Sequence, residues 1–87
     1  MQLAGQRPAN LTAKPRRIRA GRRALITFTA RTSRKPLRAG SVWLGGREYR
    51  LDRRGRALAR VRLGRGSHRA TVARPGYRRA TSAIRAR

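Results

Sequence analysis

Apolar and polar residues alternate along most of the chain, in short runs separated by glycine or proline. In residues 24–30, Ala24, Ile26, Phe28 and Ala30 occupy alternate positions, and the positions between them hold one leucine and two threonines. Alternate side chains of a β-strand point to opposite faces. The run therefore predicts a strand that buries one of its faces.

Residues 56–63 show the same period of two, with alanine, valine and leucine on one face and mostly arginine on the other. Alanine, leucine and arginine also favour helices, but the period and the flanking Gly55 and Gly64 favour a strand. Pro15 interrupts the first run, which suits an edge strand because proline cannot donate a ladder hydrogen bond. Besides this broken first strand at 11–18, strands are predicted at 41–44, 47–51, 67–73 and 80–84.

About seven short strands with turn signals between them predict one all-β domain, built as a sandwich or a barrel. The domain is expected over residues 10–87. Residues 1–9 show no periodicity and are expected to be a leader or linker. Much of the apolar content is alanine, so the core of the domain is expected to be thin.

The most specific local signal is the turn sequence Leu51-Asp52-Arg53-Arg54-Gly55. Aspartate is favoured at the first position of a type I turn, where its carboxylate accepts main-chain N–H groups, and glycine is favoured at the fourth position. Asp52 and Gly55 are therefore predicted to form a structural turn that joins two strands.

The charge of the chain narrows the range of its partners. The 87 residues include 25 Lys and Arg, of which only Lys14 and Lys35 are lysine, and the formal net charge is +23. A charge of this size attracts polyanions, and nucleic acid is the obvious one. Arginine, alanine, glycine and proline also have GC-rich codons, so compositional drift is the competing explanation. Such drift does not account for the scarcity of acidic residues.

Several classes of protein are disfavoured by what the sequence lacks. Without cysteine there is neither a disulfide framework nor a thiolate metal site. No apolar run has the length of a membrane span. Residues 1–17 lack the apolar stretch of a signal peptide, so an export signal is expected upstream in a longer chain if the domain is secreted.

Three motifs in a fixed order carry a family resemblance: Lys35-Pro36-Leu37-Arg38-Ala39-Gly40, Asp52-Arg53-Arg54-Gly55 and Arg74-Pro75-Gly76-Tyr77. Over residues 10–87 the pattern resembles the bacterial Ig-like and carboxypeptidase-regulatory-like modules of secreted and surface proteins from high-GC actinobacteria. The resemblance implies a Greek-key β-sandwich, Ig-like or prealbumin-like, that serves as a spacer, stabiliser or adhesive unit. It also implies an extracellular or cell-surface location, with neighbouring domains of a longer chain as partners.

The sequence gives little support for a catalytic site or a metal site. His68 is the sole histidine, and the alternation places it on the inner face of its strand, where the family pattern usually has an aromatic residue. Glu48 and Asp52 are surrounded by arginines in the sequence, so they are expected to be ion-paired surface groups rather than an acid–base pair. A metal site needs three or four clustered ligands, and no phosphate-binding loop of P-loop spacing occurs. We therefore expect neither an enzyme nor a cofactor.

Binding of acidic polymers is the chemistry that the sequence favours. The contributors expected to point outward from adjacent strands are Arg56, Arg60, Arg62, Arg69, Arg79 and Arg85. Trp43 is expected to face outward, either as an anchor for a partner or as an aromatic that covers the sheet beneath arginine stems. Cell-surface polysaccharide, teichoic acid and nucleic acid are all candidate partners for nonspecific, salt-sensitive binding. A small basic nucleic-acid-binding protein is the alternative function.

Overall fold

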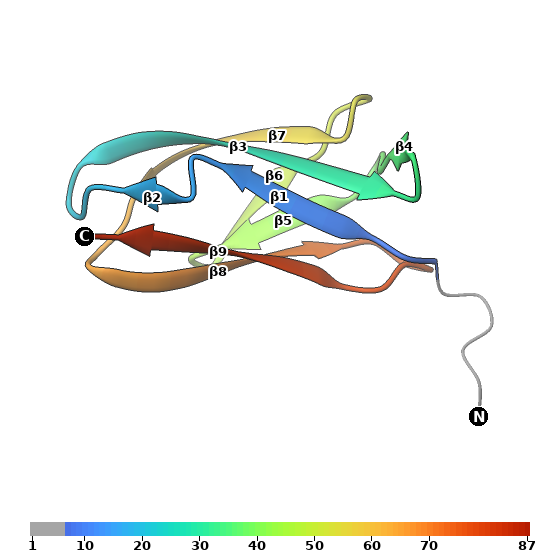
Figure 1. Cartoon of the computed structure of the whole chain (residues 1–87). Helices are drawn as coiled ribbons and strands as arrows, with labels where there is room; N and C mark the ends of the chain where they lie inside the picture. The colour runs from blue at the N-terminus through green and yellow to red at the C-terminus, as the bar shows by residue number, and fades with distance from the viewer. Residues whose placement is uncertain (1–6) are drawn as a thin grey trace.

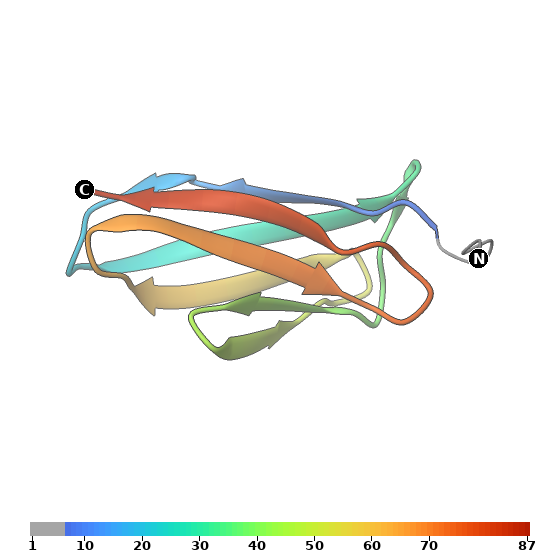
Figure 2. The ribbon, with the colours of Figure 1, turned by 90° about the horizontal axis from the view of Figure 1, so that it is seen from below.

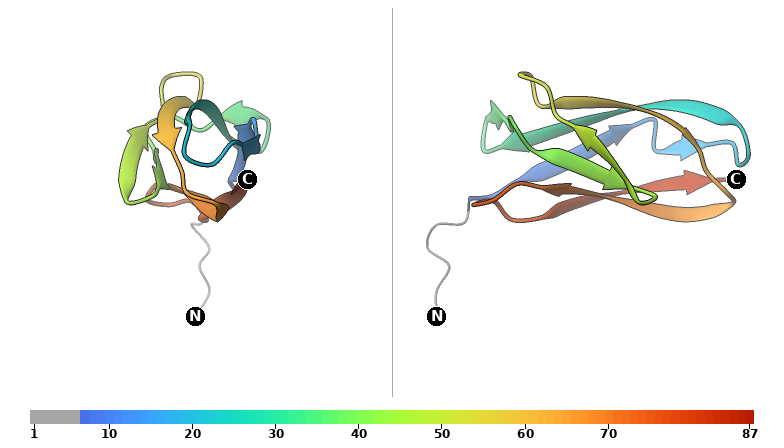
Figure 3. Two further views of the ribbon diagram at one scale, coloured as in Figure 1. Left: turned by 90° about the vertical axis from the view of Figure 1, so that its left-hand side faces the viewer. Right: turned by 180° about the vertical axis from the view of Figure 1, so that it is seen from behind.

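The computed structural model describes residues 7–87, and every regular element in this part of the chain is a β-strand. The strands form two sheets that pack face to face (Figures 1 and 2). Seen end on, strands of both sheets surround a single interior (Figure 3). The all-β prediction is therefore confirmed, and the two sheets are compatible with the expected β-sandwich.

The first sheet is built around its longest strand, β3 (Arg23–Thr32). One edge of β3 pairs with β1 (Asn10–Lys14), and the other edge pairs with β7 (Arg56–Arg62) and with β4 (Lys35–Pro36). All of these pairings are antiparallel.

The second sheet contains five strands in the order β2-β9-β8-β5-β6. Their bounds are β2 (Arg17–Ile18), β9 (Ala80–Ala86), β8 (Gly66–Ala73), β5 (Ser41–Leu44) and β6 (Arg47–Arg50). The short strand β2 runs parallel to β9, whereas the other neighbours are antiparallel.

The chain changes sheets within its first predicted strand. β1 ends at Lys14 in the first sheet, and β2 begins at Arg17 in the second, so Pro15 lies at the crossing. Both segments are edge strands, as the proline predicts. Residues 7–87 contain nine strands rather than about seven, because this first strand is split in two and the two-residue β4 was not predicted.

The core lies between the sheets and consists of the apolar sides of the alternating runs. Ile26, Phe28 and Ala30 of β3 are fully buried, and they face the second sheet, whose buried residues include Val72 and Ile84. No polar or charged residue is buried among the described residues. Alanines supply much of the remainder, so the core is thin, as expected for a chain with few large apolar residues.

The segment predicted to be a leader or linker, residues 1–9, falls partly outside the described residues. Arg7 contacts the sandwich through its main chain: its amide donates to the carbonyl of Gly76 at 2.9 Å, and its carbonyl accepts from the amide of Arg78, also at 2.9 Å. These bonds form an isolated bridge between Arg7 and Tyr77. From Arg7 onward the chain is therefore attached to the domain.

Candidate polyanion-binding surface

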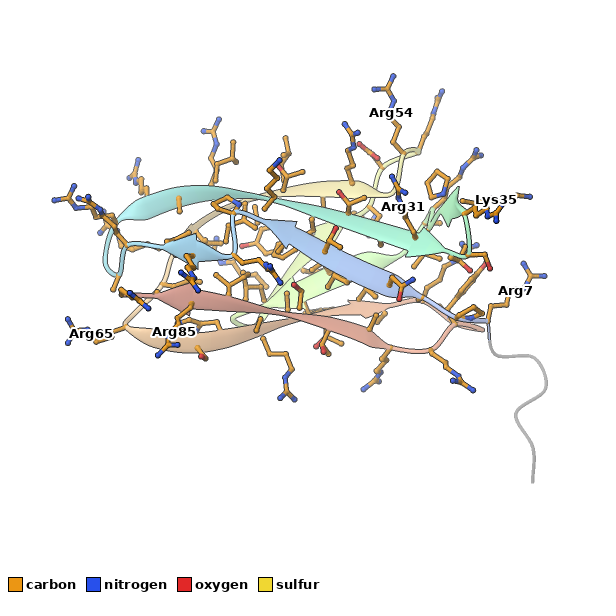
Figure 4. The ribbon with its side chains drawn as sticks, viewed as in Figure 1. Arg7, Arg31, Lys35, Arg54, Arg65 and Arg85 are labelled. Carbon is orange, nitrogen blue, oxygen red and sulfur yellow. The ribbon has the colours of Figure 1, made fainter. Side chains whose placement is uncertain are left out.

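The basic side chains cover the whole sandwich. Of the 25 Lys and Arg residues, all of which lie in the described part of the chain, 24 are exposed, and only Arg74 is half-buried. Arg74 places its guanidinium 4.8 Å from the ring centroid of Tyr77, which itself packs against the core. Figure 4 shows labelled cations at both ends of the domain, with Lys35 and Arg54 at one end and Arg65 and Arg85 at the other.

The six arginines predicted to act together are all exposed, but they do not form one surface. Arg56, Arg60 and Arg62 lie on β7 and point away from the first sheet. Arg69 of β8 and Arg85 of β9 belong to the second sheet, and Arg79 directly precedes β9. The expectation of adjacent strands was wrong because the chain crosses between sheets after Leu63, so β7 pairs with β3 and not with β8.

A groove along β1 brings together cations and hydroxyl groups, most of which are not among the predicted binding residues. Its volume is about 720 Å³, and its lining residues are Leu11, Thr12, Ala13, Lys14, Arg16, Thr27, Thr29, Arg56 and Ser82. A neighbouring hollow of about 690 Å³ shares Leu11, Thr12 and Thr29 with it and extends to Arg31 and Ser33. We call the two together the β1 groove. Only Arg56 of its residues was among the predicted binding residues.

Trp43 points outward from β5, as predicted, with 44% of its surface exposed. Its register neighbours are Glu48 on β6 and Thr71 on β8. The hydroxyl of Ser41 donates a hydrogen bond to Oε2 of Glu48, which fixes this carboxylate on the same face. One of the two acidic residues of the chain thus stands directly beside Trp43, on the outer face of the second sheet.

The turn that joins β6 to β7 has the predicted geometry. The amide of Gly55 donates to the carbonyl of Asp52 at 3.0 Å. The carboxylate Oδ1 of Asp52 accepts the amides of Arg54 at 2.8 Å and Arg56 at 3.0 Å. The bond from the Arg56 amide is the main reason that the pKa of Asp52 lies below its ordinary value of 3.8. The carboxylate of Asp52 therefore has a structural role in this turn.

His68 lies on the inner side of β8 and is half-buried, as the alternation predicts. Its Nε2 is 2.7 Å from the carbonyl oxygen of Gly64. Because a carbonyl oxygen only accepts, the hydrogen bond assigns a hydrogen to Nε2, which is the donor. In residues 7–87, no three side chains of the His, Cys, Asp or Glu types gather where they could hold a metal ion. That part of the chain also contains no helix suited to crossing a membrane.

In comparisons with known proteins, no family model, no curated protein and no solved structure matches the chain at a significant level.

Proposed function

We propose that the chain is a non-catalytic, Ig-like accessory module of a larger secreted or cell-surface protein, and that it adheres to polyanions through its basic surface. The observation that carries the proposal is the exposure of 24 of the 25 basic side chains on a small, two-layered sandwich. The domain serves as a spacer or adhesive unit, and its partners are acidic polymers and the neighbouring domains of its parent chain.

The order of the strands supports the Ig-like assignment. In Ig-like sandwiches the second and fifth main strands pair in one sheet, while the third, sixth and seventh form the other. Here β3 and β7 take the places of the second and fifth strands, and they pair in the first sheet. The places of the third, sixth and seventh strands are taken by β5, β8 and β9, which lie side by side in the second sheet. The chain leaves the first sheet after β3, contributes β5 and β6 to the second, and returns with β7. This path supports the Greek-key part of the proposal.

Electrostatics supports the adhesive role. A polyanion that approaches from any side meets exposed guanidinium groups, and their charges sum to a strongly positive field. Arginine presents a planar fork of donors to phosphate and carboxylate groups. A surface of this kind favours binding that is independent of sequence and weakens as salt screens it.

The placement of the aromatic residues gives less support to specific nucleic-acid binding. Recognition of single-stranded nucleic acid uses aromatic side chains that form a platform for the bases. Trp43 is exposed on the second sheet, whereas Tyr49 and Tyr77 are half-buried and pack against the core. The three rings form no common platform, so we favour the adhesive module over the nucleic-acid-binding protein.

Retention on immobilised polymers tests this function. The columns carry a polyuronate, a poly(glycerol phosphate), duplex DNA or neutral dextran, and each is run at low and at high salt. We expect retention on the three anionic columns at low salt, release from all of them at high salt, and no retention on dextran. If the protein is retained on none of the three anionic columns at low salt, the adhesive function is refuted.

The accessory role requires its own test. An antibody against residues 10–87 should detect the native product in the cell-wall or culture fraction, as a polypeptide longer than 87 residues. A cytoplasmic product of only 87 residues that copurifies with nucleic acid would favour the alternative function instead.

A further inference from the structure

We propose that the β1 groove binds an extended acidic polysaccharide chain. The inference rests on the polyanion adhesion proposed above, and it assigns that adhesion a principal site and a class of ligand. The groove follows an edge strand of five residues, which is roughly 17 Å of extended chain. An open, elongated site of this shape suits several consecutive sugar units rather than one small molecule.

Positive charge borders the groove along its length. Lys14, Arg16 and Arg56 line one part, and Arg31 lines the other, and all four side chains are exposed. No carboxylate lines either part. Four cations spaced along one channel match a linear chain that carries an acidic group on each repeat.

Hydroxyl groups lie between these cations in register across three strands. Thr29 on β3 is opposite Thr12 on β1 and opposite Arg56 on β7, so the three side chains form one row on the outer face of the first sheet. Thr27 stands opposite Lys14 in the next row. Cross-strand neighbours of this kind lie roughly 5 Å apart. The hydroxyl of Thr12 donates to the carbonyl of Thr29 at 3.3 Å and offers a sugar its acceptor lone pairs. A threonine hydroxyl can both donate and accept, so those of Thr27 and Thr29 complement sugar hydroxyls between the acidic groups.

Main-chain groups complete the site at the open edge of β1. On β3, the amide of Ala30 donates to Gly55 and its carbonyl accepts from Leu37, so both groups point away from β1. In an antiparallel ladder, hydrogen-bonded residue pairs alternate with pairs that are not hydrogen-bonded. Between β1 and β3, the hydrogen-bonded pairs are therefore those of Asn10, Thr12 and Lys14. The main-chain groups of Leu11 and Ala13 are then directed toward the open edge, and both residues line the groove.

The lining favours a glycan over a nucleic acid. The groove contains no tryptophan, tyrosine or phenylalanine, whereas single-stranded nucleic acids gain affinity by stacking bases on aromatic rings. A duplex would contact the surrounding cations through its phosphates, but it would not place hydrogen-bonding groups along the threonines. Acidic sugars offer carboxylates to the cations and hydroxyls to the threonines.

Two charge-matched variants test the site with a defined probe, hexagalacturonate. The groove variant combines Lys14→Gln, Arg16→Gln, Arg31→Gln and Arg56→Gln, and the control variant combines Arg22→Gln, Arg38→Gln, Arg50→Gln and Arg65→Gln, which are exposed residues outside the groove. The groove variant should bind the hexasaccharide at least about tenfold more weakly than the control variant, the loss of one charge-assisted hydrogen bond or more. Equal losses in both variants would overturn the groove as the site.

A measurement on the unsubstituted protein tests the site even if the variants fail to fold. Titration of ¹⁵N-labelled protein with hexagalacturonate should shift the amide resonances of Thr12, Ala13, Thr27 and Thr29 first. Shifts spread evenly over both sheets would refute the groove and leave general adhesion intact. An oligothymidylate of equal charge that binds more tightly at the same residues would refute the glycan. If neither probe nor any long polyanion binds at low salt, the proposed function itself fails.

Discussion

The amide of Ala30 in β3 donates a 2.8 Å hydrogen bond to the carbonyl of Gly55, in the turn that leads into β7. The carbonyl of Ala30 in turn accepts the amide of Leu37 at 2.9 Å. Ala30 therefore bonds to both Gly55 and Leu37, and the main chain of all three residues lies close together at Gly55. The residue is buried and has a φ of +72°, a conformation that glycine adopts readily and other residues rarely do.

Substitution of Gly55 should destabilise the domain. A Cβ at this position would lie 2.5 Å from the carbonyl oxygen of Ala30 and 3.0 Å from the amide nitrogen of Leu37, both of them main-chain atoms. Gly55→Ala is expected to lower the free energy of unfolding by at least about 2 kcal/mol, through strain and displacement of the hydrogen bonds. Gly64→Ala is the control, since nothing lies near its Cβ position. Equal urea midpoints for the two variants would contradict this role of Gly55.

The charge of Asp52 should make the stability of the turn depend on pH. Because the pKa of Asp52 is lowered in the folded state, its charged form contributes stability in full above 3.8, and this contribution is lost as pH falls through the folded value. Asp52→Asn keeps an acceptor but removes the charge. The unsubstituted protein should be more stable than Asp52→Asn at neutral pH, and the difference should vanish in strong acid. A difference that is constant across the titration would exclude this linkage.

Two leucines give a matched test of the core. Leu37 is 0% exposed, whereas Leu58 points outward from β7 and is 65% exposed. Leu37→Ala should cost about 2–5 kcal/mol, because it removes buried contacts and leaves a cavity. Leu58→Ala should change stability by no more than about 0.5 kcal/mol. Thermal unfolding of both variants measures the difference, and similar melting temperatures would show that the packing is not as described.

Local pattern was enough to predict most of the strands and the turn between β6 and β7. The period of two at Ile26 and Phe28 gave both the strand and its buried face, and Asp52 with Gly55 gave the turn. Each of these signals lies within a few residues of sequence. Leu37 lies between two strands, outside any alternating run, so its burial could not be read from periodicity.

The site depends on which strands pair, and the sequence pattern does not determine this. Arg62 and Arg69 are seven residues apart, and both point outward, yet the crossing between β7 and β8 places them on different sheets. The row that joins Thr12, Thr29 and Arg56 comes from three strands that are distant in sequence. Such a row becomes visible only once the register of the sheet is known.

Trp43 provides an optical test of where acidic sugars bind. It is the sole tryptophan, and it lies on the outer face of the second sheet, whereas β1 belongs to the first. Saturation with hexagalacturonate should therefore leave the wavelength of its fluorescence emission unchanged. A shift that follows the binding curve would move the site to the face that carries Trp43, and it would favour the role of partner anchor for this residue.

The salt dependence of affinity for unrelated DNA duplexes tests the electrostatic adhesion most directly. We expect all duplexes to bind alike, with a log–log slope of about −0.9 for each phosphate contact. Replacement of any one of Arg56, Arg60, Arg62, Arg69, Arg79 or Arg85 by alanine should weaken binding slightly and equally for every duplex. The contrary result is one duplex that binds about a thousandfold more tightly than the others at physiological salt, with one or two arginines each worth about 1–3 kcal/mol for that site. That outcome would replace a nonspecific adhesive module with a sequence-specific nucleic-acid-binding protein.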